Sequence, residues 1–463
     1  MTDITSASGP PDGRTARPSR RRYRHVSLGA WYYDARLLTA SRALGLAIFV
    51  CAATFSDIWI GPFPAWLILD GFGILLMAMS DAMLRSFLYV VQKLWQPVVL
   101  PWLAFEAYSL IDDAFHDSLD FERTFALQTL QLLCLLIVAG LALRTPPRQV
   151  AITIGALGTI EGLVCIGQIA QNRIAWQIPA IISKLSSHVD DVDSENSVLQ
   201  IFRVRGTVPM IAKFNPMQGM LAAFLAVLSA YPEIVRERLR LWSTAAQAAM
   251  FLSVAGVLLT FSRSTWLSLG LIFVALSASF LKSFSARRLI AVALLIGAVA
   301  VLASFSDLAA LARIFGDAAS ASNETRIHQY SYAVQVLQTS PIFGQPEHLA
   351  PGEQPIHSVL IAKFARYGIV GMSLYAAAIF GLLGTFLNRA WSADDMLKLI
   401  ARAGLAMAAV AIVDSWTHSS GFLATDATEA PFLGVLLGLM LGREAQMTLA
   451  GRGIAAPHGW SGK

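Results

Sequence analysis

The chain alternates long apolar stretches with short polar ones along most of its length. Continuous apolar runs of about twenty residues are long enough to cross a bilayer as helices, whereas barrel strands would alternate apolar and polar residues. We therefore predict an all-α, polytopic integral membrane protein. The pattern gives about twelve spans, with eleven or thirteen left open because the second and last are short or bounded by proline: 39–58, 62–80, 93–111, 125–143, 150–170, 209–231, 241–261, 264–281, 288–306, 368–387, 399–417 and 429–442.

Two polar interruptions, 171–208 and 307–367, are much longer than a connector between helices needs to be. In the second we predict a helix at 324–338, because Glu324 suits its first turn and Pro341 lies beyond its end. A short helix at 357–367 would then lie at the membrane interface before the next span.

Four regions follow from this pattern. Residues 1–38 form a basic tail rich in proline, serine and arginine, which we expect to be disordered and in which no cleavable signal peptide is evident. Residues 39–208 hold the N-terminal spans and the first long loop. Residues 209–442 form a transmembrane core with the loop 307–367, and residues 443–463 form a second tail.

The composition agrees with a membrane protein, since 56% of the residues are hydrophobic and only 14% are charged, against about 25% charged in soluble domains. The formal charge of +5 gives no reason to expect a nucleic-acid partner. Cys51, Cys134 and Cys165 all fall in apolar runs, so we interpret them as small packing residues and not as a disulfide framework.

Lysine and arginine clusters set the orientation, because such residues favour the cytoplasmic side. With twelve spans every cluster, and both termini, fall on one side, which we take as the cytoplasm. The loops 171–208 and 307–367 then face outward, and the outward loops carry acids, among them Asp112, Asp113, Asp191 and Asp193. The cytoplasmic clusters are Arg20–Arg24, Arg144 with Arg148, Arg236–Arg240, Lys282–Arg288, and Arg389, Lys398 and Arg402.

Arginines are few on the outer side. Arg203, Arg205, Arg263 and Arg326 lie there, and a guanidinium at membrane depth usually faces a partner or a wet cavity. Its planar shape suits bidentate contact with phosphate, although snorkelling or an ion pair with an outer acid is the alternative for each.

Histidines offer a proton acceptor. His357 lies in the second long loop, just before the sequence becomes apolar again. A neutral imidazole can take a hydroxyl proton near neutral pH, although a capping or interface role is the alternative. His328 and His348 are weaker candidates. Asp414 precedes His418 by four residues and could orient it on one helix face, although a structural pair is favoured.

The other acids have structural interpretations that involve no chemistry. Asp191 and Asp193 form a D-x-D pattern, but their loop is so acidic that a solvated surface is the better interpretation. Asp70, Glu106 and Glu161 are scattered in apolar spans, where helix–helix hydrogen bonds are the expected role. No Walker A, H-E-x-x-H, C-x-x-C or G-x-G-x-x-G motif supports ATP hydrolysis, zinc proteolysis or dinucleotide redox chemistry. We expect no cofactor and no metal.

Four segments in order resemble the bacterial O-antigen ligase and O-antigen or exopolysaccharide polymerase superfamily, over about residues 200–385. They are R-V-R-G-T-V-P with N-P-M before a span, T-F-S-R-S-T-W at Thr260–Trp266, T-R-I-H-Q-Y with S-P-I-F-G at Thr325–Gly344, and I-H-S-V-L-I with Y-G-I-V-G at Ile356–Gly371.

The resemblance implies a C-type membrane glycosyltransferase of the bacterial inner membrane, with a periplasmic active site. Such an enzyme transfers glycan from undecaprenyl pyrophosphate to an acceptor hydroxyl, with inversion and without a metal. The roles carried over are pyrophosphate binding by Arg205, Arg263 and Arg326, and action near the acceptor by His357. Two departures are Ser358, where the family usually has asparagine, and Gly344-Gln345-Pro346 in place of a glycine-rich stretch.

The expected partners are a lipid-linked oligosaccharide, an acceptor glycan or a lipid A core, membrane lipids, and chain-length and export proteins. We favour a polymerase, with an O-antigen ligase as the alternative, since the two differ only in the acceptor. A flippase is a rival from another class, but it would predict inverted repeats and charges near the bilayer midplane. The outer-edge arginines do not fit that expectation.

Overall fold

The computed structural model describes the residues 36–54, 59–60, 63–115, 121–174, 224, 227, 240–259, 263–283, 317–345, 356, 358–417 and 429–450. The chain divides into two compact units, residues 1–35 and 36–463, and every described residue belongs to the second. Most of the predicted disordered tail and most of the first long outer loop therefore lie outside the described residues, but residues 36–38 of the tail belong to a helix.

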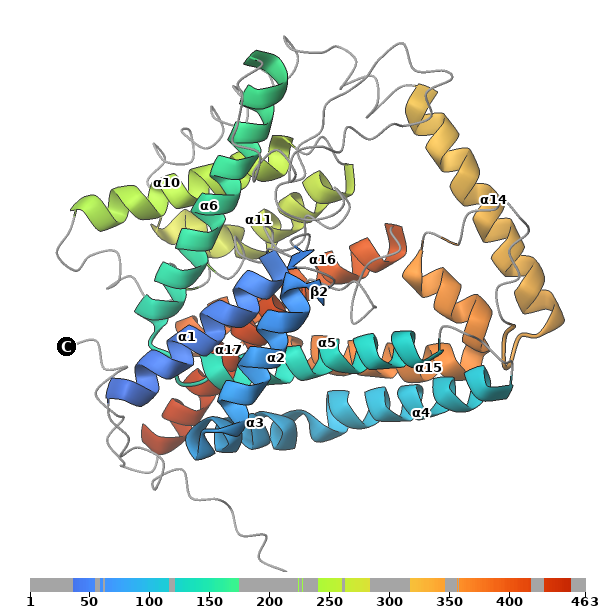
Figure 1. Ribbon diagram of the computed structural model, residues 1–463, viewed down its shortest axis with the longest axis horizontal. Coiled ribbons are helices and arrows are strands. Elements are labelled where there is room, and N and C mark those ends of the chain that lie inside the picture. The colour runs from blue at the N-terminus through green and yellow to red at the C-terminus, as the bar shows by residue number, and fades with distance from the viewer. Residues whose placement is uncertain are drawn as a thin grey trace, which may run out of the picture. The chain divides into compact units, whose positions relative to one another are not determined.

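The described chain is almost entirely helical, as the apolar pattern predicts (Figure 1). Two strands of two residues each, β1 (Trp59–Ile60) and β2 (Phe63–Pro64), pair antiparallel. The helices are α1 (Arg36–Thr54), α2 (Ala65–Ala78), α3 (Asp81–Leu94), η2 (Trp95–Val99), α4 (Leu100–Phe115), α5 (Phe121–Ala142), α6 (Pro147–Ile174), α10 (Arg240–Leu259), α11 (Arg263–Ser283), α14 (Asp317–Thr339), α15 (Val359–Leu387), α16 (Asp395–Thr417) and α17 (Ala430–Ala450).

Four of these helices are long and apolar enough to cross a membrane: Pro147–Gln168, Val359–Leu387, Asp395–Trp416 and Ala430–Leu449. A fifth span is reached if the bent pair Trp66–Ala78 and Asp81–Phe115 crosses as one. These helices support a polytopic helical membrane protein, but they do not support the count of twelve. The predicted spans 209–231 and 288–306 lie outside the described residues, except for Phe224 and Val227.

Residues 81–92 lie between two of the predicted spans and are helical. They belong to α3, whose buried side chains recur at helical spacing: Ala82, Met83, Ser86, Val90 and Leu94. Asp81, Arg85 and Lys93 are exposed among apolar side chains such as Leu88, so charge interrupts the apolar pattern and the segment has no run of membrane length. α3 leads through the π-helical turn η2 into α4, and Pro97 in that turn has no N–H for the helical ladder. Between α2 and α3 the chain bends by 103°.

The helices predicted in the second long loop match the structure in outline. α14 ends at Thr339, as predicted from Pro341, but it begins at Asp317, seven residues before the expected start. α15 has non-helical backbone at Gly368, so a first helical stretch of 359–367 precedes the predicted span at 368–387. Figure 1 shows α15 as two stretches that meet at an angle near the end of α14.

The core depends on a close contact between α5 and α17. A Cβ placed on Gly434 would lie 2.6 Å from the carbonyl oxygen of Leu135, and one on Gly442 would lie 2.6 Å from that of Leu143. Gly438, midway between them, faces the Ala139 carbonyl. Glycines four residues apart allow helix backbones to approach closely in membranes. Since the contacts advance together along both helices, α5 and α17 run parallel.

Two predicted basic clusters lie at the same end of this bundle. The C-terminal half of α17 lies beside the turn that carries Arg144, because Gly442 contacts Leu143. The turn between α15 and α16 is joined to α17 by two ion pairs: Arg389 to Glu444 at 2.8 Å, and Arg443 to Asp394 at 2.7 Å. This agreement is what the predicted orientation requires, although it does not identify the cytoplasmic side.

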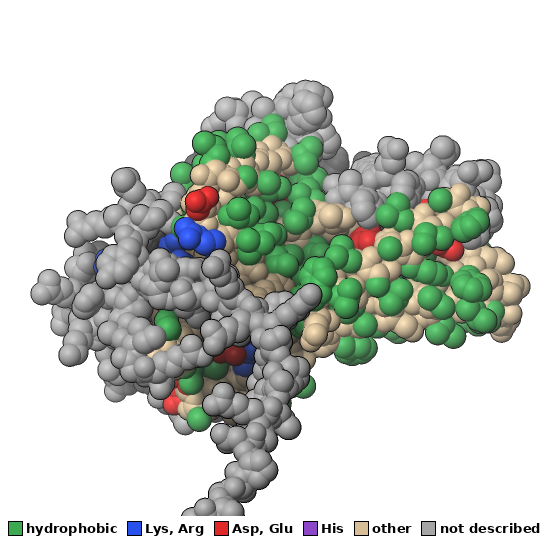
Figure 2. Space-filling model, turned by 90° about the horizontal axis from the view of Figure 1, so that it is seen from below, with side chains coloured by type: hydrophobic (Ala, Val, Ile, Leu, Met, Phe, Trp, Pro, Cys, Tyr) green, Lys and Arg blue, Asp and Glu red, His purple; other side chains and the backbone are tan. Residues whose placement is uncertain are grey.

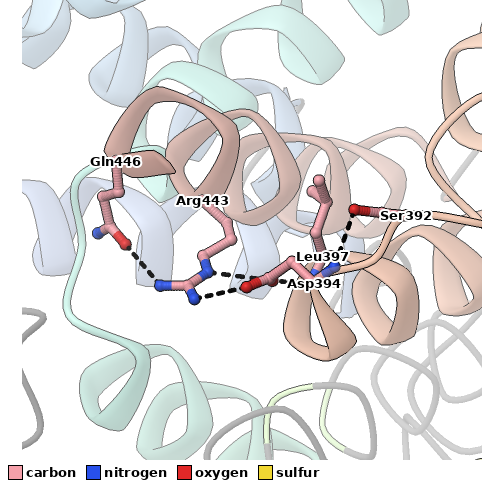
Figure 3. Close-up of polar contacts among 5 residues, drawn as sticks. All are labelled: Ser392, Asp394, Leu397, Arg443 and Gln446. Carbon is pink, nitrogen blue, oxygen red and sulfur yellow. Dashed lines mark hydrogen bonds and ion pairs between the residues drawn. The ribbon is translucent and has the colours of Figure 1, made fainter. Parts of the chain in front are cut away.

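Asp394 is the centre of that connection (Figure 3). Its carboxylate accepts from Arg443 and from the backbone N–H of Leu397 at 2.7 Å, which caps the first turn of α16. The Asp394 N–H donates to the hydroxyl of Ser392, and Gln446 accepts from Arg443. The Arg443 guanidinium, helped by the Leu397 N–H, holds the pKa of Asp394 below its ordinary value.

The described surface is rich in apolar side chains. Figure 2 shows one face on which hydrophobic side chains cover much of the described surface and few charged ones are seen. The exposed side chains include Leu88, Leu103, Ile111, Val274 and Phe380. A large exposed apolar area marks a surface that another phase or partner covers, and the candidate spans make lipid the expected one.

Candidate functional site

The structure describes only part of the predicted site. Arg203, Arg205, His357 and His418 lie outside the described residues. The backbone of Arg263 begins α11, but its side chain is not described. Arg326 is described, on α14, and is partly exposed. Asp414 is buried on α16 and is 3% exposed.

Two motif segments, S-P-I-F-G and Y-G-I-V-G, meet in a backbone joint. The Gln345 N–H donates to the carbonyl of Ala365 at 3.0 Å, the Ile369 N–H donates to Pro341 at 3.0 Å, and the Val370 N–H donates to Ile342 at 3.3 Å. We call residues 340–345 and 365–370 with these bonds the loop–helix joint. It attaches the end of α14 to the break in α15.

Glycine is required on both sides of the loop–helix joint. Gly344 has φ +75° and Gly368 has φ +60°, a region that other residues rarely adopt. A Cβ at Gly344 would overlap the carbonyl oxygens of Ala365 and Arg366, and one at Gly368 would overlap that of Ile342. The structure therefore explains why position 344 is glycine, although the glycine-rich pattern of the family is shortened here.

The residues on either side of position 357 are each anchored. Ser358 caps α15, because its hydroxyl accepts from the Ile361 N–H at 3.3 Å, and the same hydroxyl donates to the carbonyl of Ser415 on α16 at 3.3 Å. Ile356 is buried in a small apolar cluster with Ala333 and Val336 of α14. Asparagine and serine are both preferred N-cap residues, so Ser358 keeps the cap at the position where the family usually has asparagine.

α14 also reaches the end of α16. The rings of Tyr330 and Trp416 lie 6.4 Å apart in an edge-on arrangement. Tyr330 follows Arg326 by one helical turn, and Trp416 follows Ser415, the partner of Ser358. The structure thus brings the Arg326 region of α14, the start of α15 and the Asp414 end of α16 together.

An ion pair joins α15 to α4 beside this region. Arg366 donates twice to one oxygen of Asp113, from Nε at 3.1 Å and from Nη2 at 2.5 Å. The Asp113 side chain is 5% exposed and that of Arg366 is 28% exposed. The Tyr367 hydroxyl donates to the other Asp113 oxygen at 3.4 Å, and the Tyr108 hydroxyl donates to the Tyr367 carbonyl at 3.2 Å. Asp113, predicted as an acid of an outer loop, is in fact buried in the helix.

A buried lysine lies one turn earlier on α15. With the Gln128 amide turned so that both of its ends are satisfied, its oxygen accepts from Lys363 Nζ at 2.9 Å and its nitrogen donates to Glu106 at 3.2 Å. Gln128 belongs to α5 and Glu106 to α4, so three helices meet here. The ammonium also lies 4.8 Å from the ring centre of Phe105 and 5.1 Å from that of Tyr375.

Two of the three acids that lie within predicted spans, Glu106 and Asp70, have the interhelical role that the sequence suggested. Glu106 is bonded to α5 through Gln128, and Asp70 of α2 accepts from the thiol of Cys134 on α5 at 3.5 Å. Lys363 and Arg366 are two site residues that were not predicted from the sequence. Their spacing of three residues, in a segment that resumes apolar character, could have identified them as cations that need buried partners.

Comparison with known proteins agrees with the class that the motifs suggest. Residues 248–376 match the family model described as O-antigen ligase. No curated protein matches the chain. The matched region contains α11, α14, the loop–helix joint and the first stretch of α15, and it includes Arg263, Arg326 and His357 but not Arg205.

The family match confirms the resemblance to the O-antigen ligase and polymerase superfamily. It supports a role for this protein in bacterial surface polysaccharide biosynthesis, as a glycosyltransferase-like membrane protein.

Proposed function

We propose that this protein transfers glycan units from an undecaprenyl-pyrophosphate donor to an acceptor hydroxyl at the periplasmic face of the inner membrane. The observation that carries the proposal is the convergence of α14, the start of α15 and the end of α16 within or beside the region that matches the O-antigen ligase model. A lipid-borne anionic substrate would be reached from the membrane edge of such a site.

The proposed roles follow from the charge that develops during transfer. As the glycosidic bond to the carrier breaks, negative charge grows on the leaving pyrophosphate. Arg205, Arg263 and Arg326 would stabilise that charge, which is worth more in a site with little water than in solution. His357 would accept the proton of the acceptor hydroxyl, and attack on the opposite face of the sugar would invert the anomeric carbon.

The twelve-span topology belongs to the same proposal. It places both termini in the cytoplasm and loop 307–367 in the periplasm, where it covers the donor and limits its hydrolysis. The basic clusters at one end of the bundle support this orientation, because Arg144 and Arg389 lie there together.

For the acceptor we favour a second lipid-linked repeat unit, which makes the protein a polymerase. Transfer to a lipid A core sugar, as in an O-antigen ligase, is the alternative. Profiling of surface polysaccharide and lipid-linked intermediates after gene deletion separates them: loss of a polymerase leaves single units, whereas loss of a ligase leaves full-length chains on the carrier.

The mechanism is tested with the purified protein in nanodiscs, a lipid-linked oligosaccharide donor and a matching acceptor. We expect His357→Ala to lower transfer by about 10²–10⁴-fold, the usual worth of a positioned base. Donor binding should persist, because the arginines remain. Arg263→Ala should abolish transfer, and Arg263→Lys should restore only part of it, since lysine lacks the bidentate fork.

His328→Ala is the matched control, because the His328 side chain is exposed on α14, two residues from Arg326, and the proposal gives it no role. It should transfer at a near-normal rate. Full activity in both His357→Ala and Arg263→Ala would remove the proposed chemistry from these residues.

A further inference from the structure

The first stretch of α15 is held by buried charge on the side that faces α4. Lys363 and Arg366 lie three residues apart on this stretch, and Glu106 and Asp113 lie seven residues apart on α4. Residues at these spacings share one face of a helix. Asp113 binds Arg366 directly, and Gln128 connects Lys363 to Glu106.

Simple packing does not explain these charges. Lys363 is 8% exposed and Glu106 is 2% exposed, and each ion costs free energy when it leaves water. Apolar residues of similar size would hold two helices together at least as well. Unlike apolar contacts, charged pairs fix the position of one helix against another, because a slip or rotation of either helix leaves ions buried without partners.

We propose that Lys363, Arg366, Glu106 and Asp113, with Gln128 as the bridge, form a register lock that fixes the rotation and height of the 358–367 stretch against α4 and α5. This inference rests on the proposed function, because the stretch directly follows His357 in the chain. The lock sets where that stretch begins. The four charged residues are therefore positioning residues and do not touch the substrate.

Direct binding of the pyrophosphate by Arg366 fits the cluster less well. Three buried carboxylates, those of Glu106, Asp112 and Asp113, accompany the two cations Lys363 and Arg366. With all groups ionised the cluster has no excess of positive charge. The cluster therefore does not attract an anion by charge, but its ion pairs suit the role of holding a helix in position.

The test is steady-state transfer by the full-length protein in nanodiscs, with donor binding measured separately. Asp113→Asn and Arg366→Gln should each lower kcat by about 10–100-fold and leave donor affinity within about twofold, because a group misplaced by about 1 Å costs rate without weakening ground-state binding. The exchanged pair Asp113→Arg with Arg366→Asp should recover most of the loss. Arg85→Gln is the matched control, since Arg85 is exposed on α3 and bonds to its own helix.

A structural readout keeps the lock testable without activity. In Asp113→Asn the backbone amides of residues 361–367 should exchange hydrogen at least about tenfold faster than in the wild type, since the lock no longer holds the stretch closed. If the wild type transfers no glycan, the proposed function fails while this readout still tests the lock. Normal kcat and normal exchange in the single variants would overturn the lock. A loss of donor affinity at unchanged kcat would instead make Arg366 a ligand and also overturn it.

Discussion

Gly368→Ala should open the loop–helix joint. At φ +60° and ψ −162° the backbone of Gly368 lies in a region used almost only by glycine, which costs another residue about 1–3 kcal/mol. The new Cβ would also meet the Ile342 carbonyl carbon at 2.5 Å and the Gly344 nitrogen at 2.7 Å. Both are backbone atoms, so the two segments of the joint must separate to relieve the contact.

The size of the effect follows from the bonds that separation breaks. Three backbone hydrogen bonds link the two segments, and each contributes about 0.5–1.5 kcal/mol. With the strain included, the free energy that holds the joint closed should fall by about 3–7 kcal/mol. Since about 1.4 kcal/mol is a factor of ten, the amides of Gln345, Ile369 and Val370 should exchange hydrogen at least about 100-fold faster.

Hydrogen exchange with mass spectrometry in nanodiscs measures this opening. Gly384→Ala is the matched control, because it lies on the same helix and a Cβ there would meet nothing within 4 Å. The control should leave exchange in the joint unchanged. Wild-type protection of the three amides in Gly368→Ala would show that the joint tolerates a side chain, and the reasoning from its geometry would fail.

Three further predictions concern topology, pH and metals. Reporter fusions should be cytoplasmic at Arg238, Arg288 and Leu397 and periplasmic at Asp191 and Glu347, and a cytoplasmic Glu347 would exclude the proposed mechanism. The pKa of Asp394 is lower in the fold than its ordinary 3.8, so its carboxylate stabilises the fold above about pH 4, and that contribution is lost as the pH falls through the folded-state pKa. Asp394→Asn should therefore lower the Tm at pH 7 but have little effect near pH 3, whereas the exposed Asp395→Asn should matter little at either pH. Glycan transfer should continue in the presence of EDTA. If EDTA abolished transfer and a divalent cation restored it, Asp191 and Asp193 would become candidate metal ligands.

Apolar runs predicted the fold where the whole helix is apolar. Within the described ranges each predicted span overlaps a helix, although 93–111 runs from the end of α3 through η2 into α4. They failed at α3, because its buried residues Ala82, Met83 and Val90 recur at helical spacing while charged residues such as Arg85 interrupt the apolar run. The early start of α14 was missed for a similar reason, since its first residues are small and polar.

The site was predictable only as a set of segments. The motif order identified S-P-I-F-G and Y-G-I-V-G, but spacing along the chain does not show that the two segments bond to each other. Lys363 and Arg366 were missed because their partners lie on α4 and α5, about 250 residues away. Tertiary contact between distant helices is set by packing, which local patterns do not encode.

The parallel contact of α5 with α17 also has a consequence for the order of synthesis. About 290 residues separate the end of α5 from the start of α17, which takes roughly 15–60 seconds at common translation rates. Throughout that interval the face of α5 that carries Leu135 and Ala139 waits in the membrane without its final neighbour. α17, the last helix among the described residues, thus completes the centre of the bundle, so a premature stop before Gly434 would remove part of the core.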